Sequence, residues 1–554
     1  MLLRTVTVIV AGILLHGCAP KETADQPKAV LVEGTGTYSR PITTDSELAQ
    51  QFFDQGLRLT WGYYFPEAIA SHQEALRHDP EHPMIWWGLA LAAGPNPNSR
   101  YLGVPDDPHG AARDAILKAR ELIANANEYE SDLVDALYVR FDKDKHPDRL
   151  DRDTAYLNAA RRLAEKYPED SEAVALFADA YMSIRRWNYW DRDGRARPGT
   201  TRVALALERV MKVRPDHPGT NHLYIHLLEA SPHPERALPQ ADRLEALMPL
   251  AGHIVHMPSH IYVRVGRYEK AIANNIRSAA VDEEFLAAWG DIPYPTIGTY
   301  QLSARTHPSH ANDFIRYAAT VQGNYARAAE AARTSAAGVL EKDRLSGSGQ
   351  VRTASIWVVQ KIFGRWDELM ASRYESEGAV YLDGMRSYTI GSAHLAGGDM
   401  AAAAAELEKL EAFARHPDAA TLGARANKAD SVLSIAVLGL SGEIMQARGD
   451  FAGAIAAFEQ AVQLEDTFTY IEPPDWPQPM RHYLGAALLE AGRAEEAEAV
   501  YREDLAWNQN NGWSLHGLWQ ALEAQGKADE AAAARASYEA AWSGADTELT
   551  RSRI

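Results

Sequence analysis

A glycine followed five residues later by an alanine recurs along the chain, and this spacing constrains the fold more than any other feature. The pairs are Gly266 and Ala271, Gly323 and Ala328, Gly398 and Ala403, Gly449 and Ala454, Gly492 and Ala497, and Gly526 and Ala531. Glycine is favoured in the turn that ends a helix, and a small alanine lets the next helix pack closely against the first. Strand-like alternation is scarce. We therefore expect an all-α solenoid of antiparallel helix pairs over residues 45–545, in which each pair contacts only its neighbours.

The first unit of this array lies in residues 49–80. Its markers are Gly56, Ala68, Ala75 and Pro80, at separations of 12, 7 and 5 residues. Proline ends the second helix because it lacks an N–H group and clashes with the preceding turn. This arrangement resembles the tetratricopeptide repeat (TPR). The resemblance implies a right-handed superhelix whose inner wall is lined by the first helix of each pair. We also expect longer insertions between helices near residues 94–110 and 183–200.

Longer segments resemble one widespread bacterial family of TPR proteins over nearly the whole chain. They are FFDQGLRLTWGYYFPEA, WWGLALAAGPNPN, HPGTNHLYIHLLEAS, ERALPQADRL, GHIVHMPSHIYVRVGRY and LGAALLEAGRAEEAEAVYREDL. The resemblance implies the fold and the histidine blocks, but no particular reaction. Members of the family tend to carry a His-Asn-x-His-like block in the next repeat, where this chain has His310 to Asp313. That repeat is therefore not expected to supply two histidine ligands, although Asp313 offers an oxygen ligand.

Two pairs of histidines occupy matching places in neighbouring repeats. His222 and His226 are four residues apart, and so are His256 and His260. The second pair follows the first at an interval of 34 residues, which is one repeat. Both pairs therefore lie on the first helix of a unit, and residues i and i+4 share one face of a helix. We expect all four imidazoles to face a common interior space.

Further polar residues belong to the same strip of inner wall. Glu229 follows His226 by three residues and shares its helix face. His253 and His310 occupy one repeat position in two successive units, and Asp313 falls in the position of the first histidine of a pair. These residues are candidates for ligand contact beside the two histidine pairs.

The histidine pairs predict a metal site. Neighbouring helices pack roughly 8–10 Å apart, and bonds from an imidazole nitrogen to a metal are about 2.0–2.1 Å long. The predicted metal ligands are His222, His226, His256 and His260. They suit zinc, iron or copper better than magnesium, and Glu229 is placed to act as general base towards a metal-bound water. Two alternatives stay open, namely a groove that binds an anion or peptide through histidine, and a purely structural role.

Two other stretches combine polar and aromatic residues. The segment TYIEPPDWPQPMRHYLGA contains Tyr470, Glu472, Trp476, Arg481 and His482. A curled superhelix would bring Arg481 and His482 towards the cavity of the histidine pairs as ligand-binding residues, whereas a local interpretation is a proline-rich linker before a helix. Residues 185–190 lie in an insertion and predict either an aromatic lid over the groove or ordinary loop packing.

The chain opens with MLLRTVTVIVAGILLHGCAP, in which an arginine precedes an apolar run. This run is too short for a lasting membrane helix but suits a secretion signal. Residues 15–18 resemble a bacterial lipobox, which implies a signal peptide of residues 1–17 and a lipid anchor on Cys18. The alternative is an ordinary secretory signal with a chance cysteine. The alanine after Cys18 implies the outer membrane, so we expect a lipoprotein at its periplasmic face.

The ends of the mature chain are expected to lie outside the solenoid. Residues 18–44 are polar and predict a flexible tether, and residues 546–554 predict a C-terminal tail. Cys18 is the only cysteine, so an intrachain disulfide is excluded. The formal net charge of −19 disfavours nucleic acid as a partner, because an acidic surface repels phosphate.

Three functional hypotheses follow. The first is a cell-envelope metalloprotein, with an enzymatic role left open. The second is a TPR scaffold that binds an envelope protein or peptide in its inner groove. The third is a binding protein for a small acidic solute, with His253, His256 and Arg481 as donors.

Overall fold

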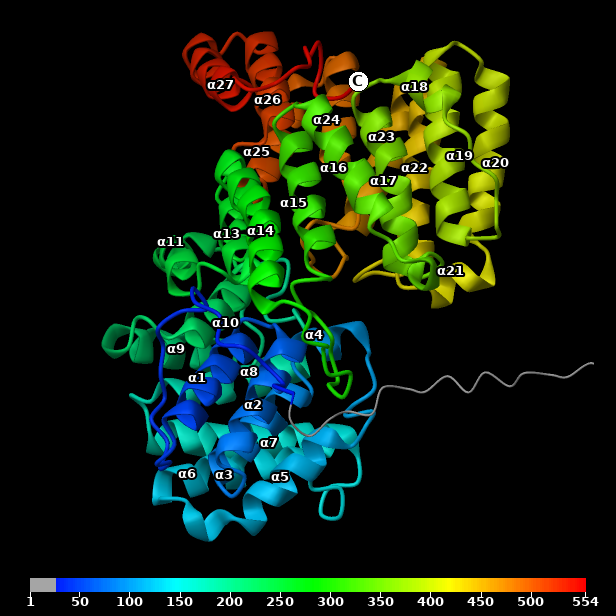
Figure 1. The fold of residues 1–554 in the computed structure, drawn as a ribbon. Helices are drawn as coiled ribbons and strands as arrows, with labels where there is room; N and C mark the ends of the chain where they lie inside the picture. The colour runs from blue at the N-terminus through cyan, green and yellow to red at the C-terminus, as the bar shows by residue number, and fades with distance from the viewer. Residues whose placement is uncertain (1–25) are drawn as a thin grey trace, which may run out of the picture.

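The computed structural model describes residues 26–554, so the expected signal peptide and Cys18 lie outside the described part of the chain. Within that part the chain forms α-helices, short 3₁₀ turns and two isolated bridges, with no named strand. Successive helices pair and the pairs stack into a curved array (Figure 1). The prediction of an all-α TPR-type solenoid is confirmed, while its right-handed sense stays a prediction. Within residues 26–554, no helix combines the length and the apolar character needed to cross a bilayer.

The array has three parts along the chain. The first consists of α1 (Glu47–Trp61), α2 (Phe65–His78), α3 (Pro83–Ala93), α4 (Pro97–Leu102), α5 (Ala111–Glu121), α6 (Glu128–Tyr138), α7 (Arg149–Lys166), α8 (Ser171–Arg185) and α9 (Thr200–Val213). The middle part consists of α10 (Pro218–Leu228), α11 (Leu238–Leu247), α12 (Gly252–His256), α13 (Pro258–Arg264), α14 (Tyr268–Trp289), α15 (Pro308–Val321) and α16 (Tyr325–Ala337).

The last part completes the array. It consists of α17 (Gly347–Ile362), α18 (Trp366–Ala371), α19 (Val380–Ala396), α20 (Met400–Ala414), α21 (Pro417–Thr421), α22 (Ala429–Ala447), α23 (Phe451–Glu465), α24 (Met480–Glu490), α25 (Ala494–Trp507), α26 (Gly512–Ala524) and α27 (Ala528–Ala541). In Figure 1 the first part lies at the bottom, the last part lies at the top, and α10 to α14 connect them.

The glycine–alanine spacing works as the sequence predicts. All six glycines have φ between +69° and +80°, the left-handed region that glycine enters without strain. The six alanines are at most 3 % exposed, so each packs directly against a neighbouring helix. Gly364 makes the same turn with φ +63°, and the buried residue five positions later is Leu369. The alanine pattern missed this unit because a leucine fills the position.

The N-terminal segment corrects the prediction of a flexible tether over residues 18–44. Residues 18–25 lie outside the described part, but residues 28–44 pack along the first helices. The backbone N–H of Val32 donates to Gln55 Oε1 at 2.7 Å, and the carbonyl oxygen of Gly34 accepts from the N–H of Leu250 at 2.9 Å. Satisfied backbone groups and buried apolar side chains such as Ala29 hold this segment in place.

The C-terminal residues 546–554 fold back on the last repeats rather than project as a free tail. The Ser552 hydroxyl donates to the carbonyl oxygen of His482 at 2.9 Å, and the Arg553 guanidinium lies 3.2 Å from Glu443. Both residues are buried. The array therefore includes its C-terminal segment as a packed element.

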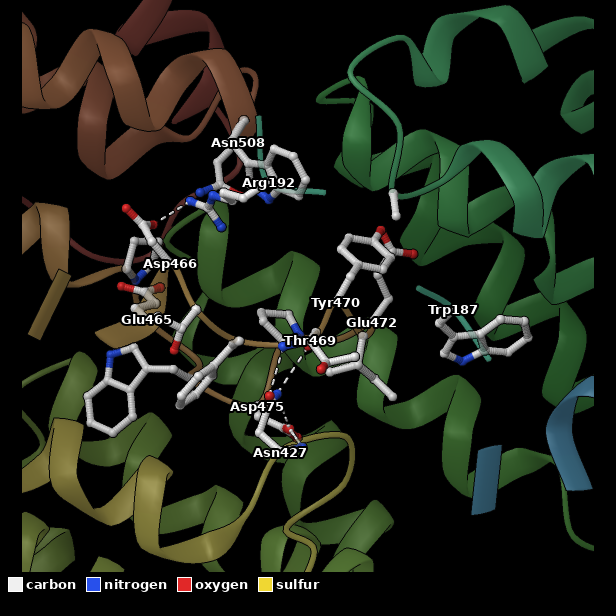
Figure 2. Close-up of a pocket in the computed structure, with 18 of the residues that line it drawn as sticks. Trp187, Arg192, Asn427, Glu465, Asp466, Thr469, Tyr470, Glu472, Asp475 and Asn508 are labelled. Carbon is white, nitrogen blue, oxygen red and sulfur yellow. Dashed lines mark hydrogen bonds and ion pairs between the residues drawn. The ribbon is translucent and has the colours of Figure 1, made fainter. Parts of the chain in front are cut away.

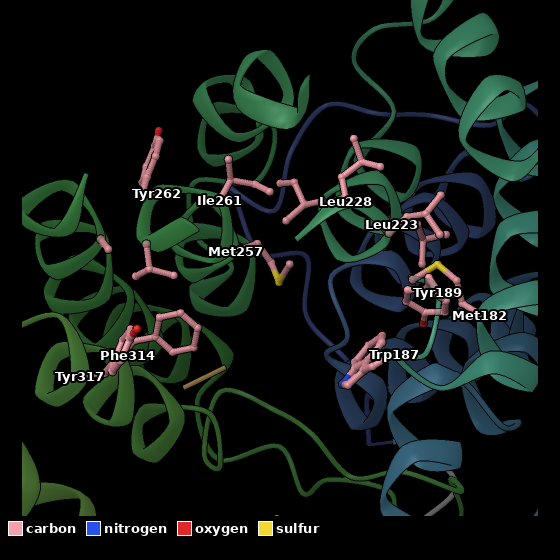
Figure 3. Packing of buried hydrophobic residues seen from close by; sticks show 14 of the residues in the cluster. Met182, Trp187, Tyr189, Leu223, Leu228, Met257, Ile261, Tyr262, Phe314 and Tyr317 are labelled. Carbon is pink, nitrogen blue, oxygen red and sulfur yellow. The ribbon is translucent and has the colours of Figure 1, made fainter. Parts of the chain in front are cut away.

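Buried apolar side chains of α10, α13 and α15 surround the middle of the array (Figure 3). Leu223, Leu228, Met257, Ile261 and Phe314 are all fully buried there. Such packing excludes water and lowers the local dielectric constant, which strengthens any electrostatic interaction among the polar groups that it encloses. The middle of the array can therefore hold a polar site that is shielded from solvent.

Two glycine substitutions separate the role of the turns from that of close packing. Gly449 has φ +80° and open space where a Cβ would project, so Gly449→Ala should cost about 1 kcal/mol through the backbone alone. A Cβ at Gly442 would lie 2.4 Å from the buried ring of Phe458, so Gly442→Ala should cost more. Gly544→Ala is the neutral control, because no atom lies within 4 Å of the place its Cβ would take. Thermal unfolding followed by circular dichroism should show the largest loss of melting temperature for Gly442→Ala, a smaller loss for Gly449→Ala and no loss for Gly544→Ala. Equal melting temperatures for the three variants would contradict this packing.

Candidate metal centre

Seven histidines gather at the centre of the array, where α10, α12, α13 and the start of α15 meet. They are His222, His226, His253, His256, His260, His307 and His310, here called the histidine cluster. Six of them are at most 5 % exposed. The centroids of neighbouring rings lie 4.7–6.4 Å apart. The rings form one continuous group that includes all four members of the two predicted pairs, whose role as metal ligands stays a prediction.

Five rings of the cluster are held by a hydrogen bond that Nδ1 donates to a fixed acceptor. These bonds run from His222 to the carbonyl oxygen of Trp61 (2.7 Å), from His226 to Glu229 (3.2 Å), from His256 to Asn275 Oδ1 (2.7 Å), from His260 to Glu472 (2.7 Å) and from His307 to Asp282 (2.9 Å). Asn275 Oδ1 is the acceptor because its Nδ2 donates to Ser259 and to the carbonyl oxygen of Ala271. With its proton held on Nδ1, a ring can bind a metal only through Nε2, as in histidines that bind metals.

The Nε2 atoms of the cluster lie at separations that suit a shared ion. The Nε2 atoms of His222 and His253 are 3.3 Å apart, and those of His256 and His260 are 3.1 Å apart. Two nitrogens bound to one tetrahedral ion by bonds of about 2.0–2.1 Å lie about 3.3 Å from each other. The rings are therefore spaced as ligands of a common ion would be.

Three fully buried ring nitrogens of the cluster have no hydrogen-bond partner among the described residues, namely His226 Nε2, His253 Nδ1 and His307 Nε2. Burial lowers the pKa of His226, and burial and neighbouring histidines lower the pKa of His253 well below its usual range. Both rings are therefore neutral at pH 7. A buried polar atom without a partner costs about 1–3 kcal/mol, and a bound cation would satisfy these lone pairs.

The ligand atoms divide into three groups of three, and within each group they lie within 4.8 Å of one another. The first group is His222, His226 and His253; the second is His226, Glu229 and His260; the third is His256, His260 and His310. The first and third groups share no residue, whereas the second shares one histidine with each. Three imidazole or carboxylate ligands are enough to hold one transition-metal ion.

Two carboxylates approach the ring of His260. Its Nδ1 lies 3.0 Å from Glu229 Oε2 and 2.7 Å from Glu472 Oε2. Burial acts to lower the pKa of His260, but the two carboxylates outweigh burial and raise it to about 10, so an ion bound at its Nε2 would displace a proton from this ring. Burial acts to raise the pKa of Glu229, yet His260 and His226 lower it to about 2, whereas burial raises the pKa of Glu472. Glu229 is therefore ionised and orients two rings, and a carboxylate so weakly basic does not suit the predicted role of general base.

Two aromatic side chains cover the cluster from strained backbone positions. Tyr63 has φ +60° and Trp187 has φ +65°, in the region that non-glycine residues rarely adopt. The ring centroid of Tyr63 lies 4.5 Å from that of His222, and Trp187 stacks on His226 at 4.7 Å. Such backbone strain costs about 1–3 kcal/mol and tends to occur at functional sites. Trp187 lies over the cluster as the lid interpretation of residues 185–190 expects.

Asp313 does not join the histidine cluster, although His310 does. The Asp313 carboxylate accepts a hydrogen bond from Ser335 at 2.7 Å and pairs with Arg352 at 3.1 Å. Its charge is therefore neutralised by Arg352, which lies on α17. The expectation that Asp313 supplies an oxygen ligand in place of a histidine is wrong in this structure.

Arg481 and His482 also lie apart from the cluster. Arg481 is held by Asp466 and Glu503, each at 2.7 Å, and His482 Nε2 lies 3.4 Å from Asp504. Both side chains are thus engaged by carboxylates of their own repeats. The expectation that they join the histidine pairs in one cavity is corrected, because Glu472 from the preceding loop takes that place.

Three residues that complete the site carry no clear signal in the sequence. His307 precedes Pro308, as helix-capping histidines do elsewhere in the chain, but its Nδ1 bonds to Asp282 instead. Asp282 on α14 also accepts a hydrogen bond from Tyr64, which fixes its position. Glu472 belongs to a proline-rich segment, and its separation of 212 residues from His260 leaves no local pattern to find.

No protein-family model and no curated protein matches the sequence. Solved structures align with most of the chain at low similarity. The crystal structure of the APC/C hetero-tetramer Cut9–Hcn1 has 14 % identity, covers 91 % of this chain and 76 % of its own, and gives a TM-score of 0.29. The human IFIT1 dimer with m7Gppp-AAAA has 14 % identity, coverages of 83 % and 89 % and a TM-score of 0.35. Yeast Tom70 has 10 % identity, coverages of 87 % and 90 % and a TM-score of 0.29. Scores this low carry no argument about function.

Replacing Glu229 tests the buried charge network. Glu229→Gln keeps the shape of the side chain but removes the charge that faces His226 and His260, so the free energy of unfolding should fall by about 3 kcal/mol. The matched control is Glu235→Gln, which breaks the exposed pair with His233, whose side chains are 52 % and 65 % exposed. That change should leave stability unaltered within error. Denaturant unfolding of the metal-free variants measures both, and equal effects would show that the network contributes nothing.

Proposed function

We propose that this protein binds two transition-metal ions in the histidine cluster. The observation that carries the proposal is that five rings donate Nδ1–H to fixed acceptors while their Nε2 atoms face one buried space. Rings that are already held in place lose little conformational freedom when an ion arrives. The unpartnered nitrogens of His226, His253 and His307 support the same interpretation.

The proposed number of two ions follows from which residues the three ligand groups share. The first and third groups can be filled together, because they have no residue in common. The second group competes with both, since it needs His226 and His260. Glu229 Oε2 lies 3.2 Å from Nδ1 of His226 and 3.0 Å from Nδ1 of His260, so one carboxylate orients a ligand of each ion.

The ligand types favour zinc, iron or copper, which imidazole binds well. Three protein nitrogens per ion leave a coordination position for water or a substrate, as in catalytic zinc sites, whereas structural zinc sites are closed by four protein ligands. The ligand count therefore leaves room for an enzymatic role. In such a role Glu229 would orient the ligand rings and another group would serve as base.

The array is a TPR-like scaffold, an architecture suited to protein binding. A protein partner would contact the groove surface rather than the histidines, because six of the seven rings are at most 5 % exposed. The buried rings therefore do not favour recognition of a peptide through histidine contacts. Pull-down from membranes, with groove variants as controls, would identify a partner bound by other residues.

We also propose that the protein is a lipoprotein of the cell envelope, attached through Cys18 at the periplasmic face of the outer membrane. The support is the lipobox-like sequence of residues 15–18 and the apolar run before it. Labelling of expressing cells with radioactive palmitate should mark the wild type and not Cys18→Ser. Equal labelling of both forms, or a soluble wild-type protein, would contradict the anchor.

Metal content should distinguish the two ion sites. Protein expressed without an affinity tag should contain about two equivalents of transition metal by elemental analysis. His253→Ala and His310→Ala should each reduce this to about one, because each removes a ligand from one group alone. The matched control is His516→Asn, a buried histidine in the repeat position of His222 that belongs to none of the three ligand groups, and this variant should keep both ions.

Absence of metal from the wild type, with no uptake on dialysis against zinc or cobalt, would overturn the proposal. Unchanged uptake in the double variant His222→Ala, His256→Ala would do the same. If the wild type holds one ion, and only His226→Ala or His260→Ala removes it, that ion is bound by the second group, which includes Glu229.

A further inference from the structure

A cavity of about 430 Å³ lies beside the histidine cluster, a size typical of small-molecule sites. Its walls come from residues 187–197, from the end of α13 and from the loop of residues 466–479 that connects α23 and α24. Figure 2 shows this loop with Trp187 on the opposite side. Two wall residues also touch the cluster: Trp187 stacks on His226, and Glu472 accepts a hydrogen bond from His260. The cavity and the cluster therefore share a wall.

Arg264 is a buried cation in that wall and has no carboxylate partner among the described residues. It is 6 % exposed, and its Nη1 donates to the backbone carbonyl oxygen of Glu229. The guanidinium lies over the ring of Trp507, 3.9 Å from the centroid, and its Nε has no hydrogen-bond partner within residues 26–554. Buried charges in proteins are ordinarily paired, so this guanidinium is suited to an anion from outside the chain.

The position of Arg264 connects it with the histidine cluster. His256, His260 and Arg264 follow one another at intervals of four residues, so they lie along one face of α12 and α13. Four residues rise by about 6 Å along a helix. An anion on Arg264 would therefore lie about one turn from His260.

The other charged groups of the wall are engaged within the chain. Arg192 and Arg481 both pair with Asp466 at 2.7 Å, and Asp475 Oδ2 accepts hydrogen bonds from the backbone of residues 426 and 427. Burial raises the pKa of Glu465 to about 7, so this carboxyl group is partly neutral near pH 7. Arg264 is the one buried guanidinium of this wall without an ion pair among the described residues, and several carboxylates surround it. This arrangement favours a ligand with a single negative charge, because a doubly charged phosphate would be repelled.

Aromatic side chains form much of the remaining wall. They are Trp187, Trp190, Tyr317, Phe468, Tyr470, Trp476 and Trp507. Such rings bind flat apolar groups by stacking and by edge contacts. The body of the ligand is therefore expected to be planar and apolar.

We propose that this cavity binds a small aromatic carboxylate, whose carboxylate group pairs with Arg264 and whose ring lies between the aromatic walls. The proposed binding of the carboxylate depends on the cavity and on Arg264, and it does not require a bound metal ion. That the cavity serves as the substrate side of the metal centre rests on the proposed function. This assignment gives to Arg264 the role that the third sequence-based hypothesis gave to Arg481, as a donor to an acidic solute.

The test uses metal-free protein and three probes of similar shape: 2-naphthoate, the neutral 2-naphthamide and 2-naphthyl phosphate. Isothermal titration calorimetry, with tryptophan fluorescence as a second readout, gives the dissociation constants. The proposal predicts that naphthoate binds at least about tenfold more tightly than the amide and more tightly than the phosphate. Equal affinity for acid and amide, tighter binding of the phosphate, or no binding of naphthoate to folded protein would overturn it.

Variants locate the contact. Arg264→Gln should reduce the preference for acid over amide to less than about twofold, and Arg264→Lys should keep part of it because the charge remains. Arg327→Gln, which removes an exposed arginine that pairs with Glu269 outside the cavity wall, is the control and should bind like the wild type. Ala230→Phe fills the cavity without touching the charge and should weaken acid and amide alike by at least about tenfold.

The last variant keeps the proposal testable even if Arg264→Gln fails to fold. Full binding by folded Ala230→Phe, or a preserved preference in Arg264→Gln, would contradict the assignment. Metal uptake is measured separately. If the wild type binds naphthoate but takes up no metal, the carboxylate site is supported and the proposed metal function is rejected. A shift of the Co²⁺ absorption spectrum on adding naphthoate is expected if both are correct.

Discussion

The hydrogen bond from His222 Nδ1 to the carbonyl oxygen of Trp61 decides what the opposite nitrogen of that ring can do. The same kind of bond orients four further rings, through Glu229, Asn275, Glu472 and Asp282. Each acceptor fixes a proton on Nδ1 and leaves Nε2 as the nitrogen that a metal ion would bind. The acceptors come from four separate parts of the chain between Trp61 and Glu472, so the orientation of the rings depends on repeats far apart in the sequence.

Part of this arrangement follows from local sequence alone. Turn glycines and helix-contact alanines predict the helix pairs, since left-handed backbone and close packing each demand a specific small residue. The 34-residue interval predicts that His222 and His226 lie opposite His256 and His260, because equivalent positions of stacked repeats face the same wall. His253 falls under the same rule. Its ring contacts that of His222, with centroids 5.1 Å apart.

The remainder depends on contacts that no repeat position encodes. Glu472 reaches His260 from a loop 212 residues away, because the array curves back on itself. His307 lies in a helix-start position that ordinarily predicts a cap, but its Nδ1 bonds to Asp282 on α14 and its ring lies in the cluster. Asp313 occupies the expected position but is neutralised by Arg352, which shows that equal position in a repeat does not fix the partner of a charged side chain.

The most direct test of the account is anomalous X-ray diffraction from crystals of untagged protein grown with zinc, recorded on both sides of the zinc absorption edge. The account predicts two anomalous peaks inside the protein. One should lie among His222, His226 and His253 and the other among His256, His260 and His310, each about 2.0–2.1 Å from its ring nitrogens. Peaks confined to surface residues, with the ring nitrogens of the cluster bonded only to one another, would contradict it.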